Sequence, residues 1–249
     1  MAEPLQAPLL SPLLSLTGVH THIGHYHILQ GVALEVPRGE LTMLLGRNGA
    51  GKTTTLRTIL GLWRASAGAI RFEGQDIARR ETPDIANLGI AYVPESMGIF
   101  AGLTVQENLA LAARHGRPGG PGLERIFRFF PPMKKFWNLP AGNLSGGQKQ
   151  MLSISRAIVE PRKLVLIDEP TKGLAPAIIQ NLIDAFAELK KSDTTILMVE
   201  QNFHAARSLG DSVAVMDGGR IVHAGRMAEL AADEALQTRL LGLSLEAHQ

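Results

Sequence analysis

The sequence GRNGAGKT at residues 46–53 is the strongest indication of the fold of this chain. It satisfies the pattern G-x-x-x-x-G-K-[ST], in which glycines let the backbone N–H groups wrap phosphates. The apolar stretch ELTMLLG precedes it from Glu40 and a helix is predicted to follow, which is the strand–loop–helix context that the pattern requires. Lys52 is expected to reach the terminal phosphates and the Thr53 hydroxyl to bind Mg²⁺. The sequence therefore predicts a phosphate-binding loop (P-loop) for a nucleotide.

A second apolar strand ends in two carboxylates. KLVLIDEP at residues 163–170 is typical of a buried parallel strand, so Asp168 and Glu169 fall at the carboxyl edge of the sheet, where ligands bind. We predict that Asp168 holds Mg²⁺ and that Glu169 orients and deprotonates a water attacking the γ-phosphate. A strand-ending Asp-Glu pair is more often a solvated terminus, but the P-loop in the same chain favours the catalytic interpretation.

A second anion-binding pattern is NLSGGQKQMLSIS at residues 143–155. Ser145 precedes two glycines and a helix whose first turn lacks β-branched residues, which predicts a helix N-terminus with free backbone N–H groups. A single P-loop is enough to bind the γ-phosphate of one nucleotide. The second loop is therefore either a plain helix cap or half of a site that another copy completes.

Composition sets outer limits on the class of protein. With 249 residues and 45% hydrophobic content, the chain can form one large domain or two small ones. A net charge of +2 without a dense Lys/Arg run gives no support for a nucleic-acid surface, and the absence of cysteine excludes disulfides. The N-terminus carries acidic Glu3 and three prolines, unlike a signal peptide. No apolar run reaches the ~20 residues of a membrane helix, so a membrane role would come through a partner.

The remaining pattern predicts an α/β fold. Short strands are expected over residues 13–36, an apolar strand IAYVPE stops at Pro94, and the last third alternates strands with helices, including one from Ala177 to Lys190. This alternation predicts a parallel sheet with helices on both faces. In the middle, we predict a helix over 104–115 with Glu107 and Asn108 on its polar side.

A flexible joint, HGRPGGPG, is expected at residues 115–122, and a second helical piece, LERIFRFF, after it.

The order of P-loop, LSGGQ and LVLIDEP resembles the ATP-binding subunit of an ATP-binding-cassette (ABC) transporter over about residues 14–241. The resemblance implies a RecA-like P-loop NTPase core with a parallel sheet, a small N-terminal antiparallel β subdomain and a helical insert. It also implies one ABC ATPase domain at 13–242 with its helical subdomain at about 98–160, followed by a tail at 243–249. The prolines near the N-terminus predict a flexible arm at 1–12.

In that family two subunits dock head to tail, so Ser145 and Gly147 are expected to cap ATP held by the other subunit. The resemblance implies an ATPase that uses ATP and Mg²⁺, with Glu169 and Gln201 as catalytic residues. The residues implied to bind nucleotide are Gly46, Arg47, Asn48, Gly49, Ala50, Gly51, Lys52, Thr53, Thr54, Ser145, Gly146, Gly147 and Gln148, and those implied to bind Mg²⁺ are Thr53, Asp168 and Glu95.

Three further stretches, YVPESMGIFAGLTVQENLALA, EPTKGLAP and ILMVEQN, look like the subunits that energise importers of branched-chain and other hydrophobic amino acids. Glu95 stands where the wider family has glutamine, Gln201 where it has a switch histidine, and Ala175 where it has aspartate. Gln201 can donate a hydrogen bond to the γ-phosphate but cannot carry charge. His204, one turn away, is an alternative, although a surface helix histidine is the more ordinary interpretation.

The N-terminal hairpin departs from the family at the residue that stacks on adenine. Ile23 aligns with the usual aromatic residue, and Tyr26 or His22 are the alternatives. The stretch HTHIGHYHI also holds several histidines, for which a metal site is conceivable. No carboxylate or cysteine accompanies them, so solvated hairpin histidines are the stronger interpretation. The histidines are His20, His22, His25 and His27.

The resemblance also implies the partners. These are integral membrane permease subunits, a second ABC ATPase subunit of the same or a related kind and, indirectly, a periplasmic or extracellular solute-binding protein, with no nucleic acid. The expected location is the cytoplasmic face of the inner membrane, as a peripheral protein. A groove beside the helical subdomain is expected to receive a permease helix. The apolar residues available to line it, or else to pack in the core, are Ile99, Phe100, Phe129, Phe130, Phe136 and Trp137.

Rival functions remain open at this point. One is a subunit for another solute, such as urea or amides, and another is a soluble ABC ATPase outside transport. Such ATPases usually carry two cassettes or long insertions, which this chain lacks. A small-molecule kinase with a P-loop would not need LSGGQ.

Overall fold

A computed structural model describes residues 11–113, 119–192 and 194–242 of the chain. Its centre is a six-stranded sheet in the order β10-β9-β3-β8-β7-β6. The five strands from β9 to β6 run parallel, and β10 pairs antiparallel at the edge. Their bounds are β3 (Leu41–Leu45), β6 (Ile90–Val93), β7 (Leu164–Asp168), β8 (Thr195–Val199), β9 (Ser212–Asp217) and β10 (Arg220–Arg226). The predicted parallel sheet is confirmed.

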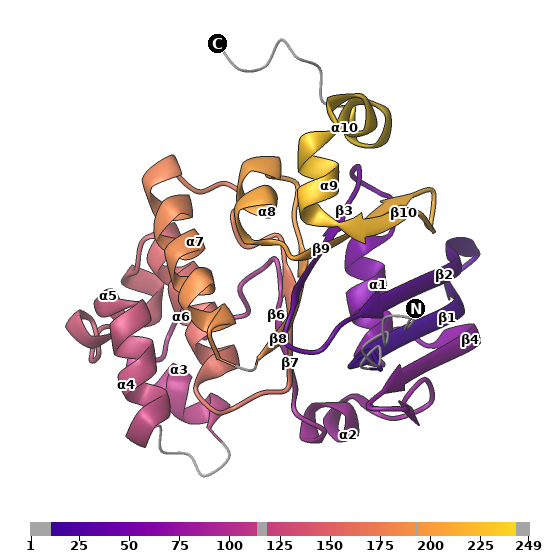
Figure 1. The fold of residues 1–249 in the computed structure, drawn as a ribbon. Helices are drawn as coiled ribbons and strands as arrows, with labels where there is room; N and C mark the ends of the chain where they lie inside the picture. The colour runs from indigo at the N-terminus through magenta and orange to yellow at the C-terminus, as the bar shows by residue number, and fades with distance from the viewer. Residues whose placement is uncertain (1–10, 114–118, 193, 243–249) are drawn as a thin grey trace, which may run out of the picture.

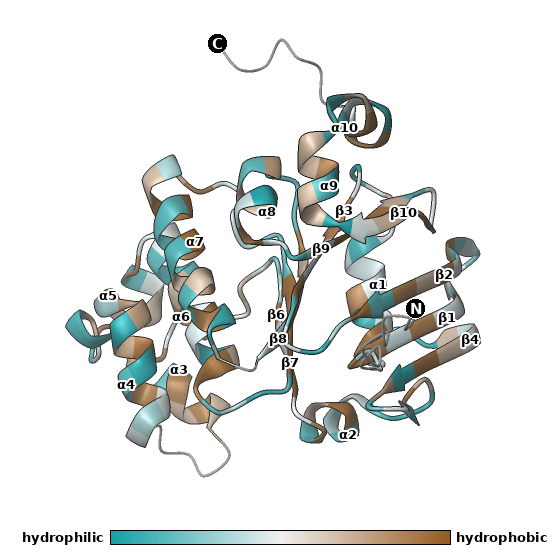
Figure 2. Cartoon of the chain, in the orientation of Figure 1, coloured by the Kyte–Doolittle hydropathy of each residue, from teal (hydrophilic) through white to brown (hydrophobic). Residues whose placement is uncertain are grey.

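Alternate residues of these strands enter two separate cores, because successive side chains of a strand point to opposite faces. In β3, Met43 packs with the helical side of the molecule, whereas Leu44 packs with the side of the second sheet. Within this sheet, β3, β7 and β8 are buried on both faces, which explains their continuous apolar runs. Figure 2 shows this apolar centre between more polar outer surfaces.

The helical core covers one face of the sheet (Figure 1). Its helices are α3 (Val105–Ala112), α4 (Gly120–Phe129), α5 (Pro131–Lys135), the short 3₁₀ helix η1 (Ala141–Asn143), α6 (Gly146–Ile158), α7 (Pro176–Lys190), α8 (Phe203–Leu209) and α9 (Met227–Ala232). The last helix of the described chain, α10 (Glu234–Leu241), follows α9.

The other face is covered by α1 (Lys52–Ile59), α2 (Thr82–Asn87) and a four-stranded antiparallel sheet. The order of that sheet is β2-β1-β4-β5, with β1 (Leu14–Ile23), β2 (Tyr26–Val36), β4 (Ala65–Phe72) and β5 (Gln75–Asp76). The prediction of helices on both faces holds for α1 and α2, although the antiparallel sheet covers much of that second face. No helix within the described ranges has the length and apolar character needed to cross a membrane.

Two expectations for the middle of the chain were wrong. Asn108 is not on a polar side of α3: it is fully buried, donating to the carbonyl oxygens of Phe100, Leu103 and Thr104 and accepting from the Phe100 N–H. The sequence does not distinguish an asparagine whose amide is buried with its hydrogen bonds satisfied from an asparagine on the surface. Glu107 does face solvent, in a capping box with Thr104.

The second helical piece begins earlier than expected. α4 starts at Gly120, inside the segment interpreted as a joint, because tight packing outweighs the low helix propensity of glycine. A Cβ atom on Gly122 would lie 2.2 Å from the carbonyl oxygen of Val159, so this turn packs directly against the end of α6. Residues 114–118, most of the N-terminal arm and the tail at 243–249 lie outside the described residues.

Candidate nucleotide-binding site

The P-loop connects β3 to α1. Gly46, Gly49 and Gly51 have φ angles of 143°, 79° and 109°, which side chains with a Cβ atom rarely adopt. At Gly46 a Cβ atom would also lie only 2.1 Å from the carbonyl oxygen of Met216, so only glycine fits against β9. Such a backbone turns successive N–H groups toward an anion.

A cavity of about 330 Å³ opens beside this loop. It is lined by residues from the P-loop and from three other segments: Ile28, Asn48, Gly49, Gly51, Lys52, Thr53, Thr54, Glu95, Glu169 and Lys172. Gly46 and Arg47 line a neighbouring cavity together with Gln201, whereas Ala50 is buried in the core. The structure therefore gathers most of the predicted P-loop residues, Glu95 and Glu169 around one space, which we call the P-loop cavity.

The Lys52 side chain is only about 5% exposed and lies on its own loop. Its Nζ donates to the carbonyl oxygens of Gly46 at 2.8 Å and Arg47 at 3.0 Å. Burial lowers the pKa of Lys52, while the nearby carboxylates of Glu169 and Asp168 oppose that shift. The ammonium is thus held at the cavity with neutral acceptors that a phosphate could replace.

Thr53 and Asp168 meet as the sequence predicts, at the carboxyl end of β7. Thr53 Oγ1 donates to Asp168 Oδ1 at 3.1 Å, and Tyr92 Oη donates to Asp168 Oδ2 at 3.2 Å. Asp168 is fully buried, and burial raises its pKa against the effect of these two hydrogen bonds. Burial and the charge of Asp168 raise the pKa of Tyr92 to about 12, so Tyr92 stays a donor.

The hydroxyl of Thr53 and the carboxylate of Asp168 are hard oxygen donors, and Mg²⁺ typically takes one or two protein oxygens together with water and phosphate oxygens. This donor set therefore fits Mg²⁺. The sequence analysis missed Tyr92, which no motif marks.

Glu169 has a φ angle of 47°, a left-handed conformation that costs a non-glycine residue about 1–2 kcal/mol. Its carboxylate is 8% exposed and lies 3.9 Å from Lys52 Nζ. Gln201 Nε2 donates to Glu169 Oε1 at 2.5 Å and to Asn48 Oδ1 at 2.6 Å. Strained backbone of this kind is concentrated at functional sites. Gln201 thus joins the P-loop to the carboxylate proposed to activate water.

The other oxygen of Glu169 faces Lys172, a residue that the sequence analysis did not select. Lys172 Nζ lies 3.3 Å from Glu169 Oε2 and donates to Glu95 Oε1 at 2.5 Å. The hydrogen bond to Glu95 and the contact with Glu169 raise the pKa of Lys172. Glu95 is therefore paired with an ammonium group, whereas Thr53 and Asp168 pair with each other.

Ser145 caps α6 in a reciprocal capping box. Ser145 Oγ accepts from the Gln148 N–H at 3.4 Å, and Gln148 Oε1 accepts from the Ser145 N–H at 2.9 Å. Gly147 has an internal reason to be glycine, since a Cβ atom there would lie 2.6 Å from Ile178 of α7. Gly146 has no such reason among the described residues, none of whose atoms lies within 4 Å of its Cβ position.

The hairpin of β1 and β2 brings one apolar residue to the P-loop cavity. Ile28 reaches the P-loop cavity, whereas Tyr26 is 76% exposed and Ile23 is half-buried. His27 stacks on His22 and on His20, with ring centroids 4.2 and 5.1 Å apart. Within residues 11–113, 119–192 and 194–242, no group of three or more His, Cys, Asp or Glu side chains could hold a metal ion. The conceivable histidine metal site therefore finds no support.

His204 lies exposed on α8. Gln201 lines two cavities, one with residues 45–48, Glu200, Phe203 and Leu241, and one with Glu169, Thr171, Lys172, Glu200 and Asn202. His204 lines neither of them.

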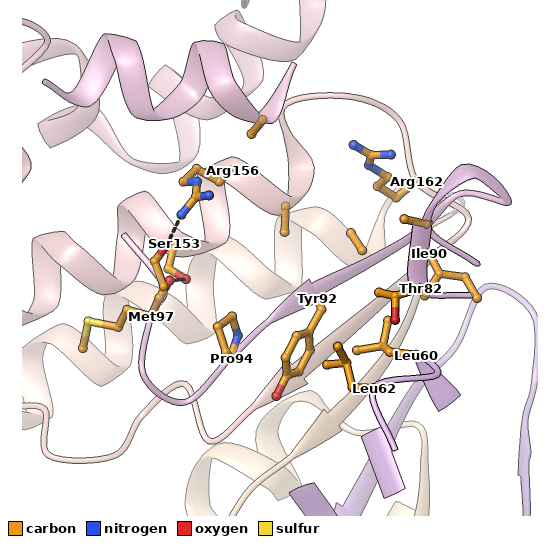
Figure 3. Close-up of a pocket in the computed structure, with 15 residues that line it drawn as sticks. Leu60, Leu62, Thr82, Ile90, Tyr92, Pro94, Met97, Ser153, Arg156 and Arg162 are labelled. Atoms are coloured by element: carbon orange, nitrogen blue, oxygen red, sulfur yellow. Dashed lines mark hydrogen bonds between the residues drawn. The ribbon is translucent and has the colours of Figure 1, made fainter. Parts of the chain in front are cut away.

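A groove of about 400 Å³ runs between the helical side and the opposite side of the molecule. Figure 3 shows its labelled residues: Leu60, Leu62 and Thr82 lie on one side, and Ser153 and Arg156 of α6 lie on the other with Met97. Ser153 Oγ donates to the carbonyl oxygen of Met97 at 2.6 Å, and the Arg156 guanidinium donates to that of Gly98. The loop that carries Glu95 is thereby fastened to α6.

For the six apolar residues available to line this groove or to pack in the core, the structure favours packing. None of the six lines it. Phe130 is in the helical core, and four others, namely Ile99, Phe129, Phe136 and Trp137, pack against that core. Phe100 is 48% exposed and lies under the Arg156 guanidinium, 5.0 Å from it. Their apolar character serves the packing of the helical insert, which spacing alone does not distinguish from a binding surface.

Three features of this chain together define an ATPase of the cassette type. They are the P-loop, the Asp-Glu pair that ends a parallel strand, and the separate capped LSGGQ helix. A family model described as ABC transporter matches residues 29–172. The chain belongs to the ABC transporter family, as an ATP-binding and ATP-hydrolysing subunit.

Among its relatives, a high-affinity branched-chain amino acid transport ATP-binding protein, BraG of Pseudomonas aeruginosa, is 38% identical over 92% of this chain and 100% of its own length. A probable branched-chain amino acid transport ATP-binding protein, LivF of Archaeoglobus fulgidus, is 33% identical over 87% of this chain and 93% of its own. The ADP conformation of an ATP-binding cassette from an ABC transporter superposes with a TM-score of 0.77 and 26% identity, covering 93% of this chain and 99% of that one. The predicted fold class and family are confirmed.

Proposed function

We propose that this chain is the ATP-hydrolysing subunit of a membrane importer of branched-chain or other hydrophobic amino acids. The observation that carries the proposal is the meeting of Lys52 and Glu169 at the P-loop cavity, where Glu169 also accepts a hydrogen bond from Gln201. The solute class is supported by the printed functions of BraG and LivF, which this chain resembles over most of its length.

In this proposal the P-loop binds the phosphates of ATP, and Lys52 exchanges its carbonyl partners for phosphate oxygens. Thr53 and Asp168 would hold Mg²⁺, and Glu95 lies with Thr53 in the wall of the P-loop cavity. When bound, Mg²⁺ neutralises charge on the phosphates. Tyr92 keeps the Asp168 carboxylate oriented by its hydrogen bond.

Glu169 accepts the proton of the attacking water, because it is the buried carboxylate that reaches both the cavity and Gln201. Gln201 fixes the orientation of Glu169 through its amide group and presents a donor toward the P-loop, at Asn48. As a neutral amide it performs this role without a change of charge.

A second cassette, identical or related, completes the site in trans. Residues 145–148 form a capped helix start whose N–H groups suit an anion. Glycine has a lower helix propensity than alanine, and no neighbour among the described residues requires it at Gly146, the first residue of α6. Close approach of a nucleotide on the second cassette supplies the missing reason.

Within the proposed complex, the chain is one domain over residues 13–242 with its helical subdomain at about 98–160. It lies at the cytoplasmic face of the membrane as a peripheral subunit, where the groove between Leu62 and Arg156 receives a short helix of a permease subunit. The loop fastened to α6 by Ser153 links that groove to Glu95. A solute-binding protein outside the membrane delivers the amino acid to the permease.

ATP-dependent association tests the paired site. Glu169→Gln should bind Mg-ATP without turnover and form a cassette dimer with itself or with its natural partner, because ATP binds the closed pair better than the separate subunits. Adding Ser145→Arg should abolish the dimer without removing ATP from the P-loop. Size-exclusion chromatography with light scattering, with and without Mg-ATP, measures this. If the natural partner is present and the double variant dimerises as well as Glu169→Gln, the trans role of Ser145 is wrong.

A further inference from the structure

A buried carboxylate outside the P-loop cavity connects the two loops that carry the proposed catalytic residues. Glu200 directly follows β8 and is only 2% exposed. No motif considered in the sequence assigns it a role. Its side chain lies between the loop after β7, which contains Glu169 and Thr171, and the loop after β8, which contains Gln201 and Asn202.

Four donors converge on this carboxylate. On the side of the β7 loop, the Thr171 N–H donates to Glu200 Oε1 at 3.2 Å, and Thr171 Oγ1 donates to Oε2 at 3.0 Å. On the side of the β8 loop, the N–H groups of Gln201 and Asn202 donate to Oε2 at 3.0 and 3.1 Å. Both oxygens are therefore used, and each loop contributes two donors.

Glu200 forms no ion pair with the lysines, arginines and histidines of the described chain. Burial raises its pKa, and the hydrogen bonds from Thr171, Asn202 and Gln201 oppose that shift. An unpaired buried charge is costly unless its hydrogen bonds satisfy it. A carboxylate at this position thus depends on the two loops keeping their arrangement, and the loops in turn are held by the carboxylate.

The two loops carry side chains that meet nearby. Glu169 is two residues before Thr171, Gln201 directly follows Glu200, and Gln201 Nε2 lies 2.5 Å from Glu169 Oε1. A shift of either backbone would change this contact, because both residues are close in sequence to a donor that Glu200 fixes.

We propose that Glu200 is a positioning residue for ATP hydrolysis: its buried carboxylate holds the Thr171 and Gln201 backbones together and so sets the alignment of Glu169 with Gln201. The inference rests on the proposed roles of Glu169 and Gln201. Glu200 and Thr171 do not line the P-loop cavity, although Glu200 borders the neighbouring cavity with Gly46 and Arg47. The hydrogen bonds of the Glu200 side chain go to the loops after β7 and β8 and not to the P-loop, so we expect its effect on turnover and not on nucleotide affinity.

A matched pair of substitutions at Thr171 tests the role with little change in shape. Thr171→Val removes the hydroxyl donor to Glu200 and keeps the branched side chain, whereas Thr171→Ser keeps the donor. For the full chain with Mg-ATP, we expect Thr171→Val to lower kcat about tenfold, because losing one such hydrogen bond raises the activation barrier of hydrolysis by about the strength of that bond. Thr171→Ser should stay within about threefold of wild type, and KM should change less than about threefold in both.

Glu200→Gln gives a second measurement. Whichever way the amide is turned, its NH₂ group faces an N–H donor from Thr171 or those from Gln201 and Asn202, so kcat should fall at least as much as in Thr171→Val. ATP affinity, measured by titration calorimetry in the absence of turnover, should remain within about threefold of wild type.

Three results would overturn the inference. The first is equal kcat for Thr171→Val and Thr171→Ser, and the second is a loss of ATP affinity as large as the loss of kcat. The third comes from a control: if Glu169→Gln hydrolyses ATP like wild type, the proposed function fails and the positioning role with it. If Glu169→Gln is inactive and the Thr171 pair is indistinguishable, only the role of Glu200 is wrong.

Discussion

Replacing Glu169 by glutamine keeps the size of the side chain and removes its basicity. In the structure, Glu169 Oε1 accepts from Gln201 and Oε2 faces the Lys172 ammonium at 3.3 Å. The amide oxygen of glutamine can keep only one of these contacts, and its NH₂ group must then face the other donor. The substitution therefore removes the proton acceptor and also weakens the alignment of the site.

The size of the effect follows from the role assigned to the carboxylate. A general base typically contributes about 10²- to 10⁴-fold to a rate, so kcat for ATP should fall by about that factor. Nucleotide binding should persist, since the glycine backbone and Lys52, which lies 3.9 Å from Glu169, remain. Loss of a negative charge from the P-loop cavity should leave ATP affinity unchanged or raise it.

Steady-state phosphate release and titration calorimetry with Mg-ATP measure the two effects separately. Asp184→Asn on α7 is a matched control, because it makes the same chemical change at an exposed acid that bonds Gln180. The control should keep wild-type kcat. A Glu169→Gln variant that retains more than about a tenth of wild-type turnover would refute the assignment of Glu169 as the base.

Substitutions at three other positions have expected outcomes. Gly46→Ala should lose ATP binding in calorimetry, because its Cβ atom would lie 2.1 Å from the Met216 carbonyl oxygen. Asn108→Leu should lower the free energy of unfolding in urea by about 2–4 kcal/mol, since it leaves the buried backbone groups of the preceding loop without partners. Lys172→Met should lower kcat about two- to fivefold, in keeping with a half-exposed ion pair, and Lys172→Arg should restore it by keeping the charge at Glu95.

Much of the fold was predictable because its signals are local. The P-loop is encoded by glycines that the backbone needs at particular φ angles, and such a need is written in consecutive residues. The strands β3, β7 and β8 are buried on both faces, so their apolar runs are continuous and easily recognised. The meeting of Asp168 with Thr53 followed from the rule that parallel strands end at one edge.

What could not be predicted depends on contacts between distant segments. Lys172 pairs with Glu95 across 77 positions, Tyr92 bonds Asp168 across 76, and Glu200 bonds Thr171 across 29. Each is a common residue type whose role appears only when the loops are packed together.

The two wrong expectations in the middle of the chain have related causes. Asn108 was placed on the surface because sequence reports polarity and not whether a polar group finds buried partners. The start of α4 at Gly120 was missed because close packing at Gly122 favours a helix that propensity does not.

Uptake of amino acids by cells tests whether this subunit energises their import. The measurement compares ATP-dependent uptake of labelled leucine, isoleucine and valine in cells whose own copy of this protein is wild type, Glu169→Gln or Asp184→Asn, with urea as a second solute. We expect Glu169→Gln to abolish uptake of at least one of the three amino acids, Asp184→Asn to leave it intact, and urea uptake to be unchanged in all three strains. Undiminished uptake of all three amino acids in the Glu169→Gln strain would contradict the claim that this subunit energises their import.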